Sequence, residues 1–151
     1  YRLRQFKKVQ NCNALRKQYE KENNFNYDFV IRGRTDIHYH LETKIEEYVK
    51  KIPYSELEET VFVFGGWHDK RKSMHSGIGL FDGFAFGRPN VMDIYSDLCD
   101  VTEIYKNGGG DELELPANQL ERHLNKNNIQ LYYIKHPKKH MPKSKAYRIV
   151  R

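Results

Sequence analysis

The sequence is poor in cysteine and contains no long apolar run, and these two deficits exclude several classes of protein. Cys12 and Cys99 are its only cysteines. They are too few for a disulfide framework, and no CxxC or Cys/His spacing typical of a zinc site surrounds them. No stretch approaches the roughly 20 apolar residues that cross a bilayer, and no secretory signal pattern opens the chain. We therefore expect neither a disulfide-stapled scaffold nor a protein with a membrane span.

The composition suits one folded domain that covers residues 1–151. Hydrophobic residues make up 38% of the chain, and eight Phe and eleven Tyr supply bulk for a core. The chain begins at Tyr1 without a methionine, and its first residues already follow a helical pattern. We therefore expect this domain to be a fragment of a longer chain.

Positive charge is concentrated in one segment of the chain, whose formal net charge is +6. Residues 135–151 hold seven Lys or Arg and no acid, whereas the rest of the chain holds 19 basic and 20 acidic residues. A basic surface over the whole domain is therefore not expected, and nucleic acid is not the expected partner. The basic segment itself fits either an anionic partner or solvent.

Strand and helix patterns alternate along the chain. Apolar spacings of three or four residues predict helices, and short runs of β-branched and aromatic residues predict buried strands. The expected helices span residues 3–22, 42–51, 90–105 and 117–126, and the expected strands span residues 27–32, 60–64, 83–86 and 129–134. Residues 67–79 read as a long loop. This alternation predicts a layered α/β/α domain.

The segment Arg32-Gly-Arg-Thr-Asp36 follows a predicted strand, where open α/β sheets place their ligands. Asp36 could hold Mg²⁺ or Mn²⁺ against a diphosphate, because these hard ions prefer oxygen ligands and accept phosphate as a partner. Arg32 and Arg34 could pair with phosphate oxygens. A solvated charged turn explains the same residues. In an extended conformation Asp36, His38 and His40 would share one face, which would suit a transition metal.

Two further candidates flank the predicted loop. Asp82 directly precedes a predicted strand, where it could act as a general base or accept a hydrogen bond from a sugar. A turn aspartate bonded to its local backbone is the alternative interpretation. Trp67 stands among polar residues and suits stacking against a sugar ring, while packing explains a lone tryptophan equally well.

Taken in order, these segments resemble glycosyltransferases with the GT-A fold. The first helix and the strand that ends at Asp36 are similar to a stretch of viral and lipopolysaccharide-type sugar transferases that closes in a DxD-like metal motif. A second stretch, from Asp82 to Tyr95, resembles their segment near the acceptor sugar, and the carboxy-terminal part resembles the close of their domain. The residues that carry the resemblance are Phe6, Cys12, Tyr19-Glu20, Tyr27-Asp28-Phe-Val-Ile-Arg-Gly-Arg-Thr-Asp36, Asp82-Gly-Phe-Ala-Phe-Gly87, Met92, Tyr95, Leu120, His123-Leu124, Ile129 and Arg148-Ile-Val-Arg151.

The resemblance implies a metal-dependent enzyme of glycan biosynthesis. Such an enzyme moves a sugar from a nucleotide-sugar donor to a hydroxyl group of a glycan or glycoprotein. The resemblance implies that Asp36 holds Mn²⁺ or Mg²⁺ and that Asp82 lies near the acceptor. It also implies that the amino-terminal nucleotide-binding strands of the fold are missing from this sequence. A viral or bacterial protein of this kind would act in the cytoplasm, and a eukaryotic one in the Golgi lumen.

Two positions depart from the family's pattern. The first Asp of the DxD motif is Arg34 here, so metal binding would depend on Asp36. An acid often found before the late helix is Ala117 here, so its catalytic role would fall to Glu112 or Glu114.

Three functions therefore stand beside one another. In sugar transfer, basic groups from the arginines above and from the basic segment would stabilise charge on the leaving diphosphate; within that segment the candidates are Lys138, Lys139 and His140. A nucleic-acid-binding module would use the same segment beside aromatic side chains. A noncatalytic structural lobe would use none of these residues for chemistry.

Overall fold

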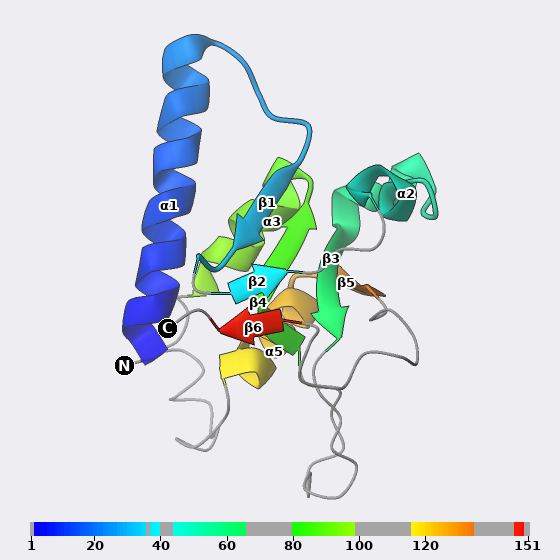
Figure 1. Cartoon of the computed structure of the whole chain (residues 1–151). Coiled ribbons are helices and arrows are strands. Elements are labelled where there is room, and N and C mark those ends of the chain that lie inside the picture. The colour runs from blue at the N-terminus through cyan, green and yellow to red at the C-terminus, as the bar shows by residue number, and fades with distance from the viewer. Residues whose placement is uncertain are drawn as a thin grey trace, which may run out of the picture.

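The computed structural model describes residues 2–35, 37–39, 44–65, 80–98, 116–134 and 147–149, which form a mixed α/β fold (Figure 1). Its helices are α1 (Arg2–Asn23), α2 (Ile45–Val49), the 3-10 helix η1 (Tyr54–Glu59), α3 (Pro89–Ser96) and α5 (Pro116–Lys126). Its strands are β1 (Val30–Gly33), β2 (Ile37–Tyr39), β3 (Thr60–Gly65), β4 (Leu80–Gly87), β5 (Gln130–Ile134) and β6 (Tyr147–Ile149). The expected α/β class is confirmed.

The main sheet has four strands in the order β1-β4-β3-β5, and β2 pairs with β6 in a separate sheet. Strand β4 runs antiparallel to both β1 and β3, whereas β3 runs parallel to β5. The strands β1, β3 and β5 therefore point in the same direction. Their carboxyl ends lie at one end of the sheet, together with the beginning of β4.

Both faces of the main sheet are covered, because alternate residues of its central strands point to opposite sides. Val61 and Val63 of β3 belong to a core cluster with residues of α1, α3 and α5. Phe62, between them, belongs to a second cluster with residues of α2 and η1. All three side chains are fully buried. The expected layering of helices on both faces of a sheet is thus present, and the buried strand predicted at 60–64 is confirmed.

Helix α1 forms where the sequence predicts it but packs through a different face. Phe6 is buried and Val9 packs against the first core cluster. Further along, Leu15 and Tyr19 are exposed, by 65% and 52%, although their apolar spacing predicts contact with the core. The second half of the helix instead turns polar side chains inward, and Glu20 is buried. Ion pairs described below replace apolar packing there.

The prediction of a buried strand at 27–32 is wrong in its extent and its burial. Strand β1 begins at Val30, and its residues alternate between half-buried and exposed. Ile31 is 54% exposed. The reason is topological, because β1 is the edge strand of the main sheet and has one strand neighbour among the described residues, β4.

The remaining elements largely follow the predicted pattern. Helix α5 and strand β5 occupy the segments expected for them, α2 is a shorter helix that ends before Pro53, and β4 begins at Leu80, three residues earlier than expected. Helix α3 begins at Pro89, one residue before the expected start, and ends at Ser96 instead of near residue 105. Strands β2 and β6 were not predicted, because three-residue strands carry little periodic signal.

Candidate functional site

The carboxyl end of the main sheet gathers the strand ends from which the candidate residues follow. Gly33 ends β1, Gly65 ends β3 and Ile134 ends β5, while Leu80 begins β4 at the same end. The register confirms this arrangement, because Gly65 lies opposite Leu80 and the neighbouring Phe64 lies opposite Ile134. Ligands of open α/β sheets bind outside the carboxyl ends of their strands, so this end is the first place to look for a site.

Strand β4 is irregular at this end. Val63 of β3 pairs with Ala85, but the next residue of β3, Phe64, pairs with Phe81, so three residues of β4 interrupt the ladder. These residues are Asp82, Gly83 and Phe84. Bulges of this kind occur often beside functional sites, because they redirect side chains and end strand pairing. The backbone of Asp82 is therefore placed at a break in the sheet, while its side chain lies outside the described part of the structure.

The end of β1 is hydrogen-bonded to this bulge. The backbone N–H of Arg34 donates to the carbonyl oxygen of Gly83 at 3.1 Å, one residue after Gly33 pairs with Phe84. The arginine-bearing end of β1 and the segment that contains Asp82 are therefore adjacent. The structure thus brings together three of the predicted site residues, Arg32, Arg34 and Asp82, at the level of the backbone.

A groove of about 730 Å³ runs between α1, β1 and α3. Its basic lining residues are Lys8 and Arg16 from α1 and Arg32 and Arg34 from β1 and its end. The other residues that line it are Val9, Cys12, Asn13, Val30, Ile31, Gly33, Thr35, Met92 and Ser96. No carboxylate belongs to this described lining. Lys8, Arg32 and Arg34 favour an anionic ligand, because each can donate hydrogen bonds to phosphate or carboxylate oxygens, whereas the Arg16 guanidinium is paired with Glu20 and Asp93.

The side chain of Arg32 is held in place by Tyr95 of α3. Its Nη1 atom donates a hydrogen bond to the Tyr95 hydroxyl at 3.1 Å, and its Cζ atom lies 5.6 Å from the centre of the same ring. Tyr95 is 3% exposed, so it offers a fixed support. An arginine that is already oriented loses less conformational entropy when it binds an anion. Its remaining N–H groups could therefore pair with a ligand at a low entropic cost.

Lys8 and Arg16 are groove residues that the sequence did not single out. Both lie on the side of α1 that was interpreted as solvated. The spacing of Phe6, Val9, Asn13, Arg16 and Glu20 by threes and fours is the signal that could have found this face, had polar residues been counted with apolar ones.

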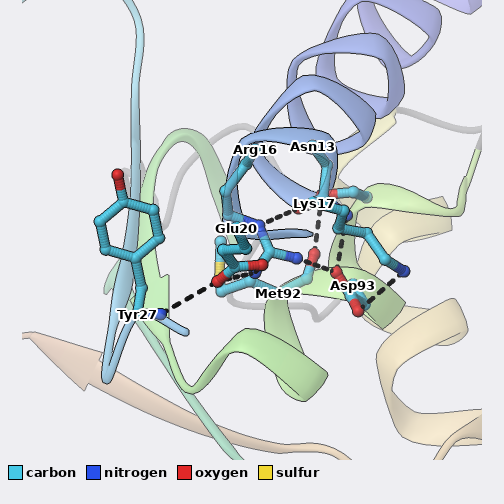
Figure 2. Close-up of polar contacts among 8 residues, drawn as sticks. Asn13, Arg16, Lys17, Glu20, Tyr27, Met92 and Asp93 are labelled. Carbon is cyan, nitrogen blue, oxygen red and sulfur yellow. Dashed lines mark hydrogen bonds and ion pairs between the residues drawn. The ribbon is translucent and has the colours of Figure 1, made fainter. Parts of the chain in front are cut away.

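Helix α1 is fixed over the groove by a cluster of ion pairs with α3 (Figure 2). The Arg16 guanidinium donates from Nη1 to the Glu20 carboxylate at 2.8 Å and from Nη2 to Oδ1 of Asp93 at 2.5 Å. Asn13 donates to the same Asp93 oxygen at 2.8 Å, and Lys17 pairs with the other oxygen at 3.0 Å. Asp93 therefore joins three residues of α1 to α3.

The same cluster reaches the segment that enters β1. Oε1 of Glu20 accepts a hydrogen bond from the backbone N–H of Tyr27 at 3.0 Å. The side chains of Arg16 and Glu20 are 11% and 9% exposed, so their charges are largely removed from water and satisfied by one another. This cluster ties the second half of α1 both to α3 and to the segment that precedes β1.

Several predicted site residues lie outside the described residues, and the structure tests no role for them. They are Asp36, Trp67, Glu112, Glu114, Lys138, Lys139 and His140.

The basic carboxy-terminal segment returns to the site end of the molecule. Its residues Tyr147–Ile149 form β6, which pairs antiparallel with β2, and His38 lies opposite Arg148. Strand β2 begins four residues after β1 ends, so β6 and the end of β1 share a neighbourhood (Figure 1). This part of the segment is therefore paired with β2, close in sequence to the end of β1.

Two residues away from the groove, Glu121 of α5 and Tyr133 of β5, have raised pKa values. Partial burial raises the pKa of the Glu121 carboxyl group. Burial also raises the pKa of the Tyr133 hydroxyl, and the negative charge of Glu121 adds to that effect. These shifts belong to the packing of α5 on the edge strand β5, and neither group lines the groove.

The residues that line the groove could bind a metal ion only together with an anionic ligand. No group of three or more His, Cys, Asp or Glu within the described ranges could hold an ion. The groove offers cations, which repel a bare metal. A divalent ion at this end would therefore depend on Asp36 and on phosphate oxygens of the ligand, a combination that Mg²⁺ commonly accepts.

None of the helices in the described ranges is both long and apolar enough to span a membrane. Comparison of the chain with protein-family models, with curated proteins and with solved structures gives no match. The function is therefore inferred from the residues and the geometry of the chain itself.

Proposed function

We propose that this chain belongs to a glycosyltransferase that moves a sugar from a nucleotide-sugar donor to a hydroxyl group of a glycan or glycoprotein. Two independent features support the proposal. The ordered motifs of the sequence resemble those of GT-A sugar transferases, and the sheet places the arginines of the first motif beside the strand that carries the second. The observation that carries it is the hydrogen bond from Arg34 to Gly83, which joins the two motifs.

The basic groove supplies the binding side of this proposal. Arg34 and Arg32 pair with oxygens of the donor diphosphate, and Lys8 adds a third cation from α1. Asp36 contributes a carboxylate oxygen for a divalent cation, Mn²⁺ or Mg²⁺, which neutralises charge on the leaving diphosphate when bound. The basic segment 135–151 contributes further positive charge, because β6 anchors its end beside β2.

Asp82 supplies the chemical step. Its carboxylate takes the proton of the acceptor hydroxyl while that oxygen forms a bond to the anomeric carbon of the sugar. The bond between this carbon and the diphosphate oxygen breaks, and its electron pair leaves with the diphosphate. A base must be held within hydrogen-bond reach of the hydroxyl, and a bulge fixed to β1 by the Arg34–Gly83 bond would provide such a position.

Replacing Asp82 by Asn tests this assignment, because Asn preserves the size of the side chain but cannot take the proton. Sugar transfer should fall by about 10²–10⁴-fold, while the affinity for the donor stays near that of the wild type. Transfer is measured with radiolabelled nucleotide-sugar and donor affinity by calorimetry. Asp28→Asn is the matched control, because Asp28 is 95% exposed at the other end of the same strand pair. If Asp82→Asn transfers sugar at the wild-type rate, Asp82 is not the base, and Glu112 and Glu114 are tested next.

A further inference from the structure

The outer edge of β1 has backbone hydrogen-bonding groups that meet no strand within the described ranges. In an antiparallel strand, the backbone N–H and C=O groups of successive residues point alternately toward one neighbouring strand and away from it. Arg34 donates its N–H to Gly83 of β4, so Arg32 and Val30, at steps of two, also direct their backbone groups toward β4. The N–H and C=O groups of Ile31 and Gly33 point to the opposite side. Along this side the structure describes no strand partner for β1.

The side chains along this edge form two distinct strips. Val30 and Arg32 face the groove, where Val30 packs against the first core cluster and Arg32 contacts Tyr95. The side chain of Ile31 projects to the opposite face by strand alternation and is 54% exposed, although the residue also contributes to the groove lining. A strand paired with β1 would therefore place one set of alternate side chains over the groove and the other set beside Ile31. The first set meets positive charge and the second set meets an apolar side chain.

The charge of the groove selects among possible occupants of this edge. Its described lining carries Lys8, Arg32 and Arg34 and no carboxylate, while the guanidinium of its fourth basic residue, Arg16, is paired with Glu20 and Asp93. A second copy of the chain would bring the same cations to the same place, and like charges across paired strands are destabilising. An occupant with carboxylates on its groove side would gain charge-assisted hydrogen bonds instead. Exposed strand edges commonly bind extended peptides in this way.

We propose that the outer edge of β1, with the adjoining groove, binds an extended segment of another polypeptide by strand addition. The bound segment alternates carboxylate side chains, which lie over the groove, with apolar side chains, which cover Ile31. This docking surface shares Lys8, Arg32 and Arg34 with the groove proposed above for the donor diphosphate, but its backbone contacts lie along Ile31 and Gly33, so the exchange and Ile31→Pro tests below do not depend on sugar transfer.

Capped eight-residue peptides test the proposal on the full 151-residue chain. The probe alternates Val and Glu, and its matched control alternates Val and Lys. The Val/Glu peptide should bind at least tenfold more tightly than the Val/Lys peptide, as measured by fluorescence anisotropy. Lys8→Glu should weaken binding of the Val/Glu peptide several-fold, since Lys8 is exposed and its replacement leaves the core intact. Equal binding of the two peptides, or no binding of either at millimolar concentration, would overturn the proposal.

Backbone substitution separates strand addition from simple charge attraction. Ile31→Pro removes an N–H that points away from β4, so the main sheet keeps its bonds while the outer edge loses one. Binding of the Val/Glu peptide should fall at least tenfold. Amide hydrogen exchange of the wild type gives a second readout that needs no variant. The peptide should slow exchange of the Ile31 and Gly33 amides and leave that of Arg32, which already bonds to β4, unchanged. Unaltered exchange at Ile31 and Gly33 in the saturated complex would show that no strand is added.

Discussion

Strands β3 and β1 lie on either side of β4, yet they meet very different surroundings. Val61, Phe62 and Val63 of β3 are fully buried between strands on both sides and helices on both faces. In β1, Ile31 is 54% exposed and Arg32 faces a groove lined by cations. Two apolar strands of one sheet thus serve different purposes. Strand β3 holds the core together, and β1 presents Arg32 and an outer edge that has no strand partner among the described residues.

The difference teaches that position in the sheet, rather than strand composition, separates buried from exposed residues here. The middle of a central strand is covered by strands on both sides and by helices on both faces. An edge strand has one side without a strand neighbour, and the residues that lie beside that side determine which ligands it can bind. In this chain the neighbour is the polar face of α1, held at its place by Asp93. Substitutions in the two strands should therefore change different measurable properties.

The largest expected effect concerns the core around β3. The Phe62 ring is fully buried and stacks on Phe86, with a centroid distance of 4.5 Å and an interplanar angle of 2°. Phe62→Ala should lower the free energy of unfolding by about 3–5 kcal/mol, because it leaves a large cavity. In the edge strand, Ile31→Ala should cost about 1 kcal/mol or less, since half of the side chain already contacts water. Urea denaturation measures both, and equal losses would show that β1 belongs to the core as much as β3 does.

An intermediate effect is expected where α1 is attached to α3. Asp93→Asn removes the charge that Arg16 and Lys17 both pair with and leaves Arg16, which is 11% exposed, with Glu20 as its carboxylate partner in the described contacts. The free energy of unfolding should fall by about 1–3 kcal/mol.

Lys17→Met is the control for the Asp93 variant, because it removes a pair whose lysine side chain is 56% exposed. Exposed ion pairs contribute about 0–1 kcal/mol. A loss as large for Lys17→Met as for Asp93→Asn would contradict the view that the partly buried Arg16 pair holds the helix.

The smallest effect is expected beside the other edge strand, β5. Burial raises the pKa of the Glu121 carboxyl group above its usual value of 4.5 in the folded chain. The folded state therefore binds the carboxyl proton of Glu121 more tightly than the unfolded state does. The resulting stabilisation of the fold is complete below pH 4.5 and is lost as pH rises through the raised pKa. Glu121→Gln keeps a neutral side chain at all pH values. It should raise the Tm at pH 7 by at most about 2 °C and leave it unchanged at pH 4, and a lower Tm at pH 7 would contradict the burial effect.

Local patterns in the sequence predict the elements whose form depends on their own residues. The helix over 3–22, the strands over 60–64 and 129–134 and the helix over 117–126 all appear in the structure close to their predicted bounds. The apolar periodicity of each segment and helix-breaking residues such as Pro53 determine these elements from local sequence alone. The α/β class follows from their order.

Features that depend on distant segments could not be predicted in the same way. Nothing in residues 27–32 shows that β1 is an edge strand, because this depends on where β3 and β4 lie. The pairing of β2 with β6 joins segments that lie far apart in the sequence. Lys8 and Arg16 looked solvated because the groove exists only once α1 packs beside β1. Asp93 gave no signal, since its partners lie on another helix.

Donor binding at the carboxyl end of β1 tests the central claim most directly. The measurement is titration calorimetry of UDP and GDP in the presence of Mn²⁺, with the wild-type chain and with two variants that each remove one carboxylate next to the same strand. Asp36→Asn changes the carboxyl end, where the proposal places the metal, and Asp28→Asn changes an aspartate that is 95% exposed at the amino end. The account predicts Mn²⁺-dependent binding that Asp36→Asn abolishes and Asp28→Asn preserves, with both variants folded by circular dichroism. Metal-dependent binding that is equal in all three chains, or absent from the wild type, would contradict it.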